Sequence, residues 1–509
     1  MLLLLSPCSS QQAPPAGTAF FRVNTTASAQ VILGLGFEIQ SDSIGSGNHG
    51  LPDENTSVPW DLTPSERVRF ARELLAGFRF CRLALGLYFR GLTPDNASIV
   101  ERWPGQSGGL AEMAALSGIE GFAVEYWSPA PFWKSNGAYI DGGLRGTDPA
   151  FMSAFGAAVA GDALYLKARG IEPVWWALQN EPAVGPTGCI YSCAGINAST
   201  YHVAFKATAS AVRKALPDAI IHASSWSGQH WSPAISADPA ALALVDVWTF
   251  HRVGADSNDQ IDNAAYFLAN TSGRPVANNE FEYLDSHTDP VRTINTAQSI
   301  MNWLVFEDAP VWYWLHALKP LTNSEADGYA LGFWQPPLSP VANSSLAPGH
   351  FDLNADNLNA IAGFTKYMPW NAVRVPVAED AVRYDQRVLA YRFDPARARW
   401  RLAAGVPHPP PLEQPARATL RDGAAARAAA TDLAVVLTNR WAVNSFRAVV
   451  ALGGLPAGAP PPRFAGFSYG PTASDVPLGE LTPTRNATTG EYFFQSVLPP
   501  LSIQFWVQQ

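Results

Sequence analysis

Eight short apolar runs, each followed by a segment with a helical pattern, recur along the first two thirds of this 509-residue chain. The runs are rich in β-branched and aromatic residues, which favour strands. They span residues 31–39, 78–87, 121–127, 173–178, 220–226, 245–250, 275–283 and 311–318. Regular alternation of strand and helix predicts a parallel sheet, and eight repeats predict a closed (β/α)8 barrel over residues 30–350. The alternative is an open doubly wound sheet, but no glycine-rich phosphate-binding turn follows the first run.

Two of the intervening helices have readable end signals. Thr63-Pro-Ser-Glu66 has the form of a capping box with proline at the first helical position. Asp148 and Pro149 begin another helix, and Gly170 is its expected C-terminal stop.

The pattern changes after about residue 350. Short alternating runs at 388–393, 432–437, 446–452 and 503–507 are separated by turns rich in proline and glycine. Such runs are typical of an antiparallel β-sandwich. We expect residues 351–509 to form this side domain, together with a strand from residues 19–29. The proline-rich residues 406–415 and the Ala/Arg tract 421–430 are expected to be long loops.

The N-terminus and the glycosylation signals bear on the compartment. Residues 1–5 are a short apolar run, so we expect residues 1–18 to be a signal-peptide remnant or a disordered N-terminus. Seven Asn-x-Ser/Thr sequons add modest weight; they begin at Asn24, Asn55, Asn96, Asn197, Asn270, Asn343 and Asn486. The interpretation is a secreted glycoprotein, or one of an endomembrane or lysosome-like compartment.

Charge and hydropathy exclude two classes of partner. The chain has 34 Lys and Arg against 43 Asp and Glu, a net charge of -9, and it has no basic run. Binding to nucleic acid or to an anionic membrane surface is therefore not expected. No stretch after the N-terminus approaches the roughly 18 apolar residues of a membrane span. We expect a monomer without an integral membrane segment.

The four cysteines indicate a disulfide rather than a metal site. Cys189 and Cys193 lie in a loop flanked by glycine, where an oxidising compartment favours a local disulfide. Zinc is less favoured because no second Cys/His pair is near in sequence. Cys81 lies in an apolar strand and is expected to be a buried thiol.

Two of the predicted strands end in carboxylates. The fourth run leads into Asn180 and Glu181, and the seventh into Glu280 and Glu282. Active sites of such barrels lie at the carboxyl ends of the strands, and the fourth and seventh strands face one another across the axis. A single glutamate at a strand end is usually solvated, but two on facing strands are what glycosidic cleavage needs.

Three stretches resemble glycoside hydrolase family 30, the glucosylceramidase-like group of barrel enzymes. Gln179-Asn-Glu-Pro182 is similar to the acid/base signature of the clan. Tyr126-Trp-Ser-Pro-Ala-Pro-Phe-Trp-Lys-Ser-Asn-Gly137 is similar to a stretch on the family's third strand. Asn359-Ala-Ile-Ala-Gly-Phe-Thr-Lys-Tyr-Met-Pro-Trp370 is similar to the segment that leads into its side sandwich. The resemblance implies a retaining glycosidase for β-glycosidic bonds that needs no cofactor or metal.

The departures from the family pattern lie where the substrate is held. Gly34-Leu-Gly-Phe-Glu-Ile-Gln-Ser-Asp-Ser43 replaces the family's Gly-Phe-Gly-Gly opening. Tyr88-Phe-Arg90 stands where the family has Asp-Phe-Ser, and Val253 stands where an aromatic residue usually follows His251. The chain is therefore interpreted as a divergent member, with a glucosylceramide-like, β-1,6-glucan, galactan or xylan-type substrate.

The resemblance assigns roles to the acids. Glu181 matches the acid/base and Glu280 the nucleophile, with about 5 to 5.5 Å between their carboxyl groups. The two-residue period of a strand cannot by itself choose between Glu280 and Glu282. Glu282 is then expected at the rim, in contact with sugar hydroxyls. The charge of Glu280 is expected to raise the pKa of Glu181 toward the working pH.

The remaining candidates have structural alternatives. Asn180 is expected to donate to the sugar hydroxyl beside the anomeric carbon, and Arg82 to lie beneath Glu280 and keep it ionised. Either residue also fits a purely structural bond. His251 is a candidate partner of the carboxylates, or a buried core residue. Trp127, Trp133, Trp226 and Trp314 are candidates for sugar stacking or for core packing.

Two further function classes stay open. One is a barrel that binds glycan without cleaving it, and the other is a structural extracellular protein with this fold, because fold alone does not imply activity. Retention of both Glu181 and Glu280 favours the enzyme.

Overall fold

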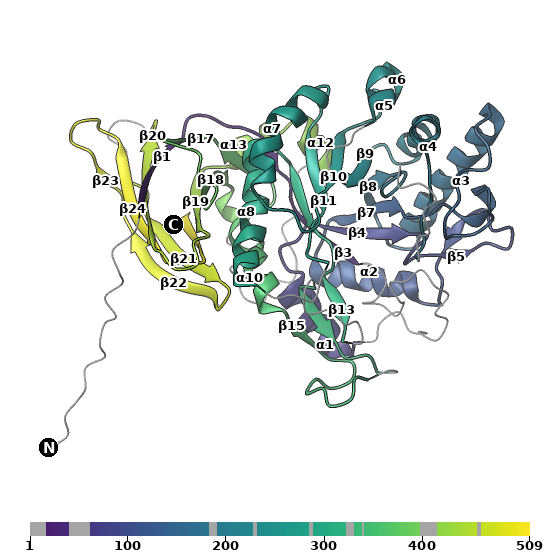
Figure 1. Cartoon of the computed structure of the whole chain (residues 1–509), viewed down its shortest axis with the longest axis horizontal. Helices are drawn as coiled ribbons and strands as arrows, with labels where there is room; N and C mark the ends of the chain where they lie inside the picture. The colour runs from purple at the N-terminus through teal and green to yellow at the C-terminus, as the bar shows by residue number, and fades with distance from the viewer. Residues whose placement is uncertain are drawn as a thin grey trace.

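Eight parallel strands close into a barrel in the computed structural model of the chain (Figure 1). The structure describes residues 17–39, 62–182, 191–227, 232–284, 289–321, 330–337, 340–397, 415–455 and 460–509. The barrel strands are β3 (Gly34–Ile39), β4 (Phe80–Leu85), β7 (Gly121–Tyr126), β8 (Pro173–Ala177), β9 (Ile220–Ser227), β10 (Val247–His251), β11 (Val276–Glu280) and β12 (Val311–Trp314). Pairing of β12 with β3 closes the ring. The predicted (β/α)8 barrel is confirmed.

The first predicted strand is in fact two strands in two different sheets. β2 (Val31–Ile32) pairs with β16 (Ala372–Val375) of the side domain, whereas β3 belongs to the barrel. Gly34 lies at the change of direction with φ of +144°, and a Cβ there would come within 3.1 Å of Arg79 and Trp370. A glycine therefore allows the chain to cross from one sheet to the other within three residues.

The eighth predicted run is also divided. β12 ends at Trp314, and β13 (Leu318–Pro320) forms a separate small sheet with β14 (Gly332–Trp334) and β15 (Phe351–Leu353). The apolar run continues past the barrel because these residues are buried too, so hydrophobicity alone did not mark the strand end.

Helices surround the barrel between its strands. They are α1 (Pro64–Arg69), continued by the π-helix η2 (Phe70–Leu74), and α2 (Gln106–Ser117), α3 (Pro149–Ala168), α4 (Ala198–Ala215), α5 (Pro233–Ala237), α6 (Pro239–Leu242), α7 (Asp259–Asn270) and α8 (Pro290–Phe306). Asp148 caps α3 as predicted, accepting from the N–H groups of Ala150 and Phe151.

Only one of the two hydrogen bonds of the predicted capping box forms at α1. The Thr63 hydroxyl accepts from the Glu66 N–H at 3.3 Å. The Thr63 N–H, however, donates to the carbonyl of Gly349, and the Glu66 carboxylate accepts from Arg69 and from the Phe351 N–H. Tertiary partners thus replace the local bond.

The side domain is a sandwich of two sheets. One has the order β17 (Val377–Glu379), β1 (Gly17–Asn24), β20 (Phe446–Gly453), β24 (Tyr492–Leu498) and β23 (Thr484–Arg485). The other has the order β2, β16, β18 (Gln386–Phe393), β19 (Asp432–Asn439), β25 (Ser502–Gln508), β21 (Phe464–Gly470) and β22 (Ala473–Leu481). The pairing is antiparallel except between β1 and β20, which are parallel. β1 begins at Gly17, inside the range predicted to be a disordered N-terminus.

The Ala/Arg tract is not a loop. It carries α13 (Ala424–Ala429) and the last residue of the preceding α12 (Ala416–Arg421), because alanine and arginine are strong helix formers. Most of the predicted proline-rich loop 406–415 lies outside the described residues.

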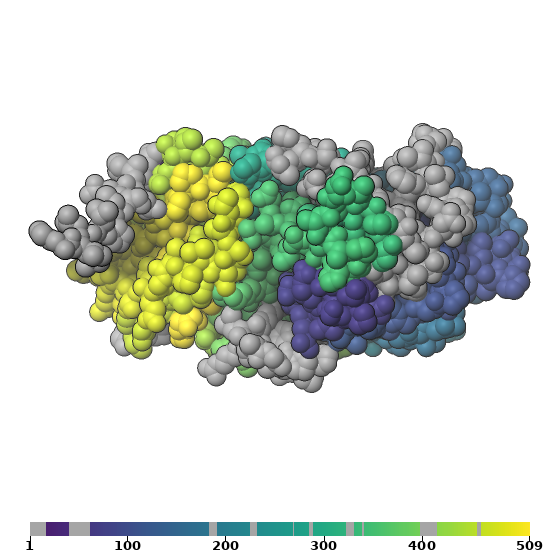
Figure 2. All heavy atoms as spheres, turned by 90° about the horizontal axis from the view of Figure 1, so that it is seen from below, coloured from purple at the N-terminus to yellow at the C-terminus, as the bar shows by residue number. Residues whose placement is uncertain are grey.

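The two domains share a continuous interface. α8 and α10 (Ala355–Tyr367) lie between the barrel and the sandwich in Figure 1. Gln298 on α8 donates to the Thr438 hydroxyl at 3.1 Å, and Asn359 on α10 donates to the carbonyl of Gly470 at 3.1 Å. Figure 2 shows the C-terminal strands in yellow at one end of the molecule and early barrel repeats in blue at the other.

One helix in the described ranges, α3, is long and apolar enough to cross a membrane by length and composition. Its buried face includes Met152, Phe155 and Val159, and the helix packs beside α4 on the outside of the barrel. Packing in this layer accounts for its apolar composition.

Candidate active site

The fourth barrel strand, β8, leads into Glu181. Past the strand end, the Asn180 N–H donates to the carbonyl of Tyr126 at 2.7 Å, which extends the contact with β7. Glu181 itself has φ of +44°, a left-handed conformation that is uncommon outside glycine. Such strained positions cluster at functional sites, where the surrounding structure holds them.

The seventh strand, β11, ends at Glu280. Its register with β10 shifts by one residue, so that Phe250 faces Asn278 and His251 faces Glu280. Bulges of this kind re-aim side chains next to active sites. Here the shift brings the His251 and Glu280 side chains together at the mouth.

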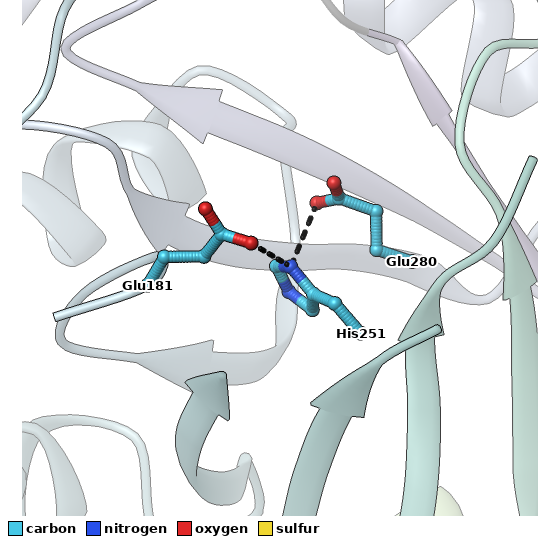
Figure 3. Close-up of side chains that lie close together, drawn as sticks. All are labelled: Glu181, His251 and Glu280. Carbon is cyan, nitrogen blue, oxygen red and sulfur yellow. Dashed lines mark hydrogen bonds and ion pairs between the residues drawn. The ribbon is translucent and has the colours of Figure 1, made fainter. Parts of the chain in front are cut away.

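His251 connects the two glutamates (Figure 3). Its Nδ1 lies 3.0 Å from Oε1 of Glu181 and 3.5 Å from Oε2 of Glu280. Because a carboxylate only accepts hydrogen bonds, Nδ1 carries the proton in the bond to Glu181. The two acids, predicted from separate strand ends, thus converge on one imidazole.

Arg82 on β4 forms the floor of this cluster. A guanidinium has five N–H donors, and the bonds from Arg82 account for all of them. Nη1 donates to Glu280 at 2.5 Å and to Glu38 at 2.7 Å, while Nη2 donates to Asn180 at 2.6 Å and to Glu125 at 2.5 Å. Nε donates to Glu125 at 2.8 Å. The predicted position of Arg82 beneath Glu280 agrees with this geometry, but no donor is left to bind a substrate.

Glu38 on β3 and Glu125 on β7 are site residues that the sequence reasoning missed. Both are buried inside the barrel, and both bind Arg82. A signal was present, because each is a carboxylate within an otherwise apolar strand, where a buried charge needs a partner.

The pKa of Glu181 differs from the expectation. Burial raises the pKa of this carboxyl, but the hydrogen bond and positive charge of His251, together with the charge of Arg82, outweigh burial and lower it below its ordinary value. For His251, burial lowers the pKa, and the charge of Glu280 and the bond to Glu181 raise it above the ordinary value overall. The expected raised pKa of Glu181 is therefore wrong for this arrangement, because the expectation left out His251.

Two predicted substrate contacts do not lie at the surface. Glu282 is 0% exposed, and its carboxylate oxygens both lie 2.7 Å from Nδ1 of His316, so it is a buried residue and not part of the rim. Trp314 is also 0% exposed and donates from its indole N–H to the carbonyl of His316. Its ring packs against Phe281 and Trp312 and offers no face to a sugar.

The other tryptophans and Asn180 give a mixed result. The ring of Trp127 is nearly buried, with the Arg82 guanidinium 4.4 Å from its centroid, so packing accounts for it. Trp133 is likewise nearly buried, and the Trp226 side chain lies outside the described residues. Because Oδ1 of Asn180 accepts from Arg82, its amide nitrogen is the donor that the predicted sugar contact requires; that contact stays a prediction.

Tyr191 is an exposed aromatic residue beside the acid that the sequence reasoning did not select. Its side chain is 37% exposed, and the charges of Glu181 and Glu280 contribute to raising the pKa of its hydroxyl, after burial. The segment that follows it is anchored next to Glu181, since the Ile196 N–H donates to the carbonyl of Pro182 at 3.0 Å.

The cysteine predictions are tested only in part. Cys81 is a buried free thiol, as predicted. Cys189 lies outside the described residues, so its disulfide with Cys193 stays a prediction. Around Cys193, the buried Lys134 donates to the Cys193 carbonyl at 2.7 Å and to the Ser128 hydroxyl at 2.8 Å, which connects the loops after β7 and β8.

A divalent metal is the other ligand to consider for the cluster. One ligand atom each from Glu181, His251 and Glu280 lies within 4.8 Å of the others. Arg82, however, is bonded to Glu280 at 2.5 Å and approaches Nε2 of His251 to 3.4 Å, so a cation there would meet a fixed positive charge. The residues present do not fit a metal.

The fold and the cluster define the class: a (β/α)8 barrel with a sandwich alongside and paired glutamates after its fourth and seventh strands. Solved structures share this fold. The catalytic domain of a glycoside hydrolase family 30 xylanase from Talaromyces cellulolyticus has a TM-score of 0.62 and 15% identity, covering 96% of this chain and 100% of that one. A subfamily 8 xylanase of the same family, from Clostridium acetobutylicum, has a TM-score of 0.63 and 15% identity, covering 96% and 99%.

A third similar structure, an endo-β-1,6-glucanase, has a TM-score of 0.62 and 13% identity, covering 97% of this chain and 95% of that one. No protein-family model and no curated protein sequence matches the chain. At such low sequence identity, the similarity to these structures shows a shared fold and nothing more.

Proposed function

We propose that this protein is a retaining glycoside hydrolase, a divergent member of glycoside hydrolase family 30, that cleaves β-glycosidic bonds by double displacement. The observation that carries the proposal is the convergence of Glu181 and Glu280 on Nδ1 of His251, at 3.0 and 3.5 Å. A carboxylate oxygen of Glu181 and one of Glu280 lie within 4.8 Å of one another, a separation that allows the spacing of about 5–5.5 Å between carboxyl groups of retaining enzymes.

In the first step, a carboxylate oxygen of Glu280 attacks the anomeric carbon while the bond to the leaving oxygen breaks. Glu181 gives its proton to that oxygen, so that the aglycone departs as an alcohol. In the second step, Glu181 takes a proton from water, the water oxygen attacks the anomeric carbon, and the ester to Glu280 breaks. Arg82 holds the Glu280 carboxylate in place through both steps.

The substrate class follows from the similar structures and from the resemblance in sequence. Two are xylanases and one is an endo-β-1,6-glucanase. We therefore infer a β-linked glycan or glycoconjugate, with xylan, β-1,6-glucan, galactan and glucosylceramide as the candidates. Secretion or passage through an endomembrane compartment, and a Cys189–Cys193 disulfide, are part of the same proposal.

The test is a hydrolysis screen followed by trapping. Purified protein is given aryl β-glycosides, xylan, β-1,6-glucan, galactan and glucosylceramide, and then a 2-deoxy-2-fluoro glycoside of the sugar that reacts. We expect a covalent adduct that peptide mapping assigns to Glu280 and that the E280Q variant does not form. Hydrolysis without any adduct, and with inversion at the anomeric carbon by NMR, would contradict the retaining mechanism.

The second candidate is a barrel that binds glycan without cleaving it. It predicts binding of one of these glycans in calorimetry with no product after long incubation. Retention of both acids in bonding contact with His251 favours the enzyme.

A further inference from the structure

One guanidinium serves three carboxylates at the base of the proposed site. Glu38, Glu125 and Glu280 all accept from Arg82, at distances of 2.5 to 2.8 Å. Full ionisation of these four side chains would leave two negative charges in excess. Carboxylates so close in a buried site do not all ionise together, because their repulsion is little screened.

In the part of the chain that the structure describes, Glu38 accepts from a single donor, whereas Oε2 of Glu125 accepts from Nε and Nη2 of Arg82 and from the Asn279 amide, and Glu280 also lies 3.5 Å from His251. The Glu38 side chain is 1% exposed, and only Oε2 is bonded, to Nη1 of Arg82. Oε1 is buried and has no hydrogen-bond partner among the described residues. A buried carboxylate oxygen without a donor is costly when the group is charged and much less so when it is neutral.

The groups that face Glu38 come from several strands. They are Cys81 and Arg82 on β4, Glu125 on β7, and Glu280 with the nearby Glu282 at the end of β11. Burial raises the pKa of Glu38, the charge and hydrogen bond of Arg82 lower it, and the charges of Glu280 and Glu125 raise it. The net result is a pKa well above the ordinary value.

We propose that Glu38 is a positioning residue for Glu280: it holds a proton in the active protein, and so leaves the charge of Arg82 to the proposed nucleophile. This inference rests on the proposed function. Glu38 lies in the first-strand stretch in which the chain departs from the family's Gly-Phe-Gly-Gly sequence.

The mechanism is competition for one nitrogen. Glu38 and Glu280 both accept from Nη1 of Arg82, at 2.7 and 2.5 Å. When Glu38 is neutral, it accepts only a weak hydrogen bond from this nitrogen, and Arg82 orients the Glu280 carboxylate. When Glu38 loses its proton at higher pH, it becomes an equal competitor with a full charge, and the Glu280 carboxylate loses its fixed position.

The first measurement is independent of activity. Infrared difference spectra between acidic and alkaline pH detect the carbonyl band of a protonated carboxyl group. Glu282 and Glu307 also have raised pKa values and contribute to the carbonyl absorption at neutral pH. We expect E38Q to lose the component of this band that belongs to Glu38 and E66Q to keep every component. Glu66 is a matched control because it is also buried and paired with an arginine, Arg69 at 2.8 Å, and has no bond to Arg82 among the described residues.

The second measurement links the proton to Glu280. The pH dependence of kcat/KM is recorded on a dinitrophenyl glycoside, whose leaving group needs no acid. One unit above the midpoint of the alkaline limb, the wild type and E66Q should retain about a tenth of their maximum. E38Q should retain more than half of its own maximum, because a glutamine cannot lose a proton in this range.

An unchanged infrared band in E38Q would overturn the proposal, since the proton would then be elsewhere. E38Q could also lose its band while its alkaline limb coincides with that of the wild type. That result would overturn the claim that the proton on Glu38 positions Glu280. Should E38Q not fold, E38D provides both readouts, with a shifted band and a shifted limb expected. If the wild type hydrolyses no glycoside, the proposed function fails, while the infrared result still decides whether Glu38 holds a proton.

Discussion

Glu181 is bonded to His251, with Nδ1 of the imidazole 3.0 Å from the carboxylate, and this contact lowers the pKa of the proposed acid below its ordinary value. A general acid must be protonated to act, so in the free protein the contact limits the pH at which Glu181 can donate. A substrate that breaks or lengthens the bond would raise the pKa of Glu181 as it binds, because burial then dominates.

The first prediction concerns this bond. H251F removes the hydrogen bond and the positive charge that lower the pKa of Glu181, while burial still raises it. On a substrate with a poor leaving group, the alkaline limb of kcat/KM should therefore move to higher pH, even though the maximum falls. The limb on a dinitrophenyl glycoside should move less, because no acid is needed there. An alkaline limb that stays in place on the poor substrate would contradict the assignment.

The second prediction separates the roles of the two acids. E181A should retain cleavage of a dinitrophenyl glycoside, and azide should accelerate its second step and give the β-glycosyl azide, since azide needs no general base. E280A should lose at least about 10³-fold in rate on every substrate, and azide should give the α-azide if any product forms. NMR of the azide products distinguishes the two. Equal loss in both variants with no azide product would favour the glycan-binding alternative.

A third prediction concerns Tyr191, which is exposed and lies near enough to Glu181 and Glu280 for their charges to raise the pKa of its hydroxyl. Y191A should lower kcat/KM about two- to tenfold on substrates with an extended aglycone, which corresponds to the roughly 0.5–1.5 kcal/mol of an aromatic contact. The effect should be mainly on KM and smaller in Y191F. Tyr384 is the control, because it is 49% exposed on the side domain. An equal effect of Y384A would argue against a contact between Tyr191 and the substrate.

The fourth prediction is a pH-dependent stability. Both carboxylate oxygens of Glu307 are buried without a hydrogen-bond partner among the described residues, and burial, with the charge of Asp308, raises its pKa to about 8. Between its ordinary value near 4.5 and about 8, the folded state binds more protons than the unfolded state, so stability falls as pH rises.

E307Q lacks this titration. The Tm of E307Q should exceed that of the wild type, and the difference should grow between pH 5 and pH 8. The corresponding gain in the free energy of unfolding is at most about 5 kcal/mol at pH 8. The variant E112Q, at an exposed glutamate, should show a difference that does not depend on pH. A constant difference for E307Q as well would show that Glu307 is ionised throughout.

A fifth prediction tests the cysteines. Peptide mapping of the oxidised protein should find Cys189 linked to Cys193, while Cys81 should react with a thiol reagent only after denaturation, because it is buried. Labelling of Cys189 and Cys193 in the native oxidised protein would contradict the disulfide.

The periodic pattern of the sequence determined the barrel, because each repeat had to bury one apolar strand under a helix. It also determined that Glu181 and Glu280 follow the fourth and seventh strands, since strand order alone places those ends at one mouth. The stretches 31–39 and 311–318 were predicted wrongly as single strands, because burial in two different sheets gives one continuous apolar run.

Only the tertiary structure decided how the acids are held. The pKa of Glu181 depends on His251, which comes from another strand 70 residues away, and the pairing of His251 with Glu280 depends on a register shift between β10 and β11 that no local pattern marks. The same is true of Glu282, which lies two residues from Glu280 but is buried against His316. Glu38, Glu125 and Glu280 meet on Arg82 because barrel closure brings four strands to one point, and charge interactions depend on distance in space rather than on separation in the chain.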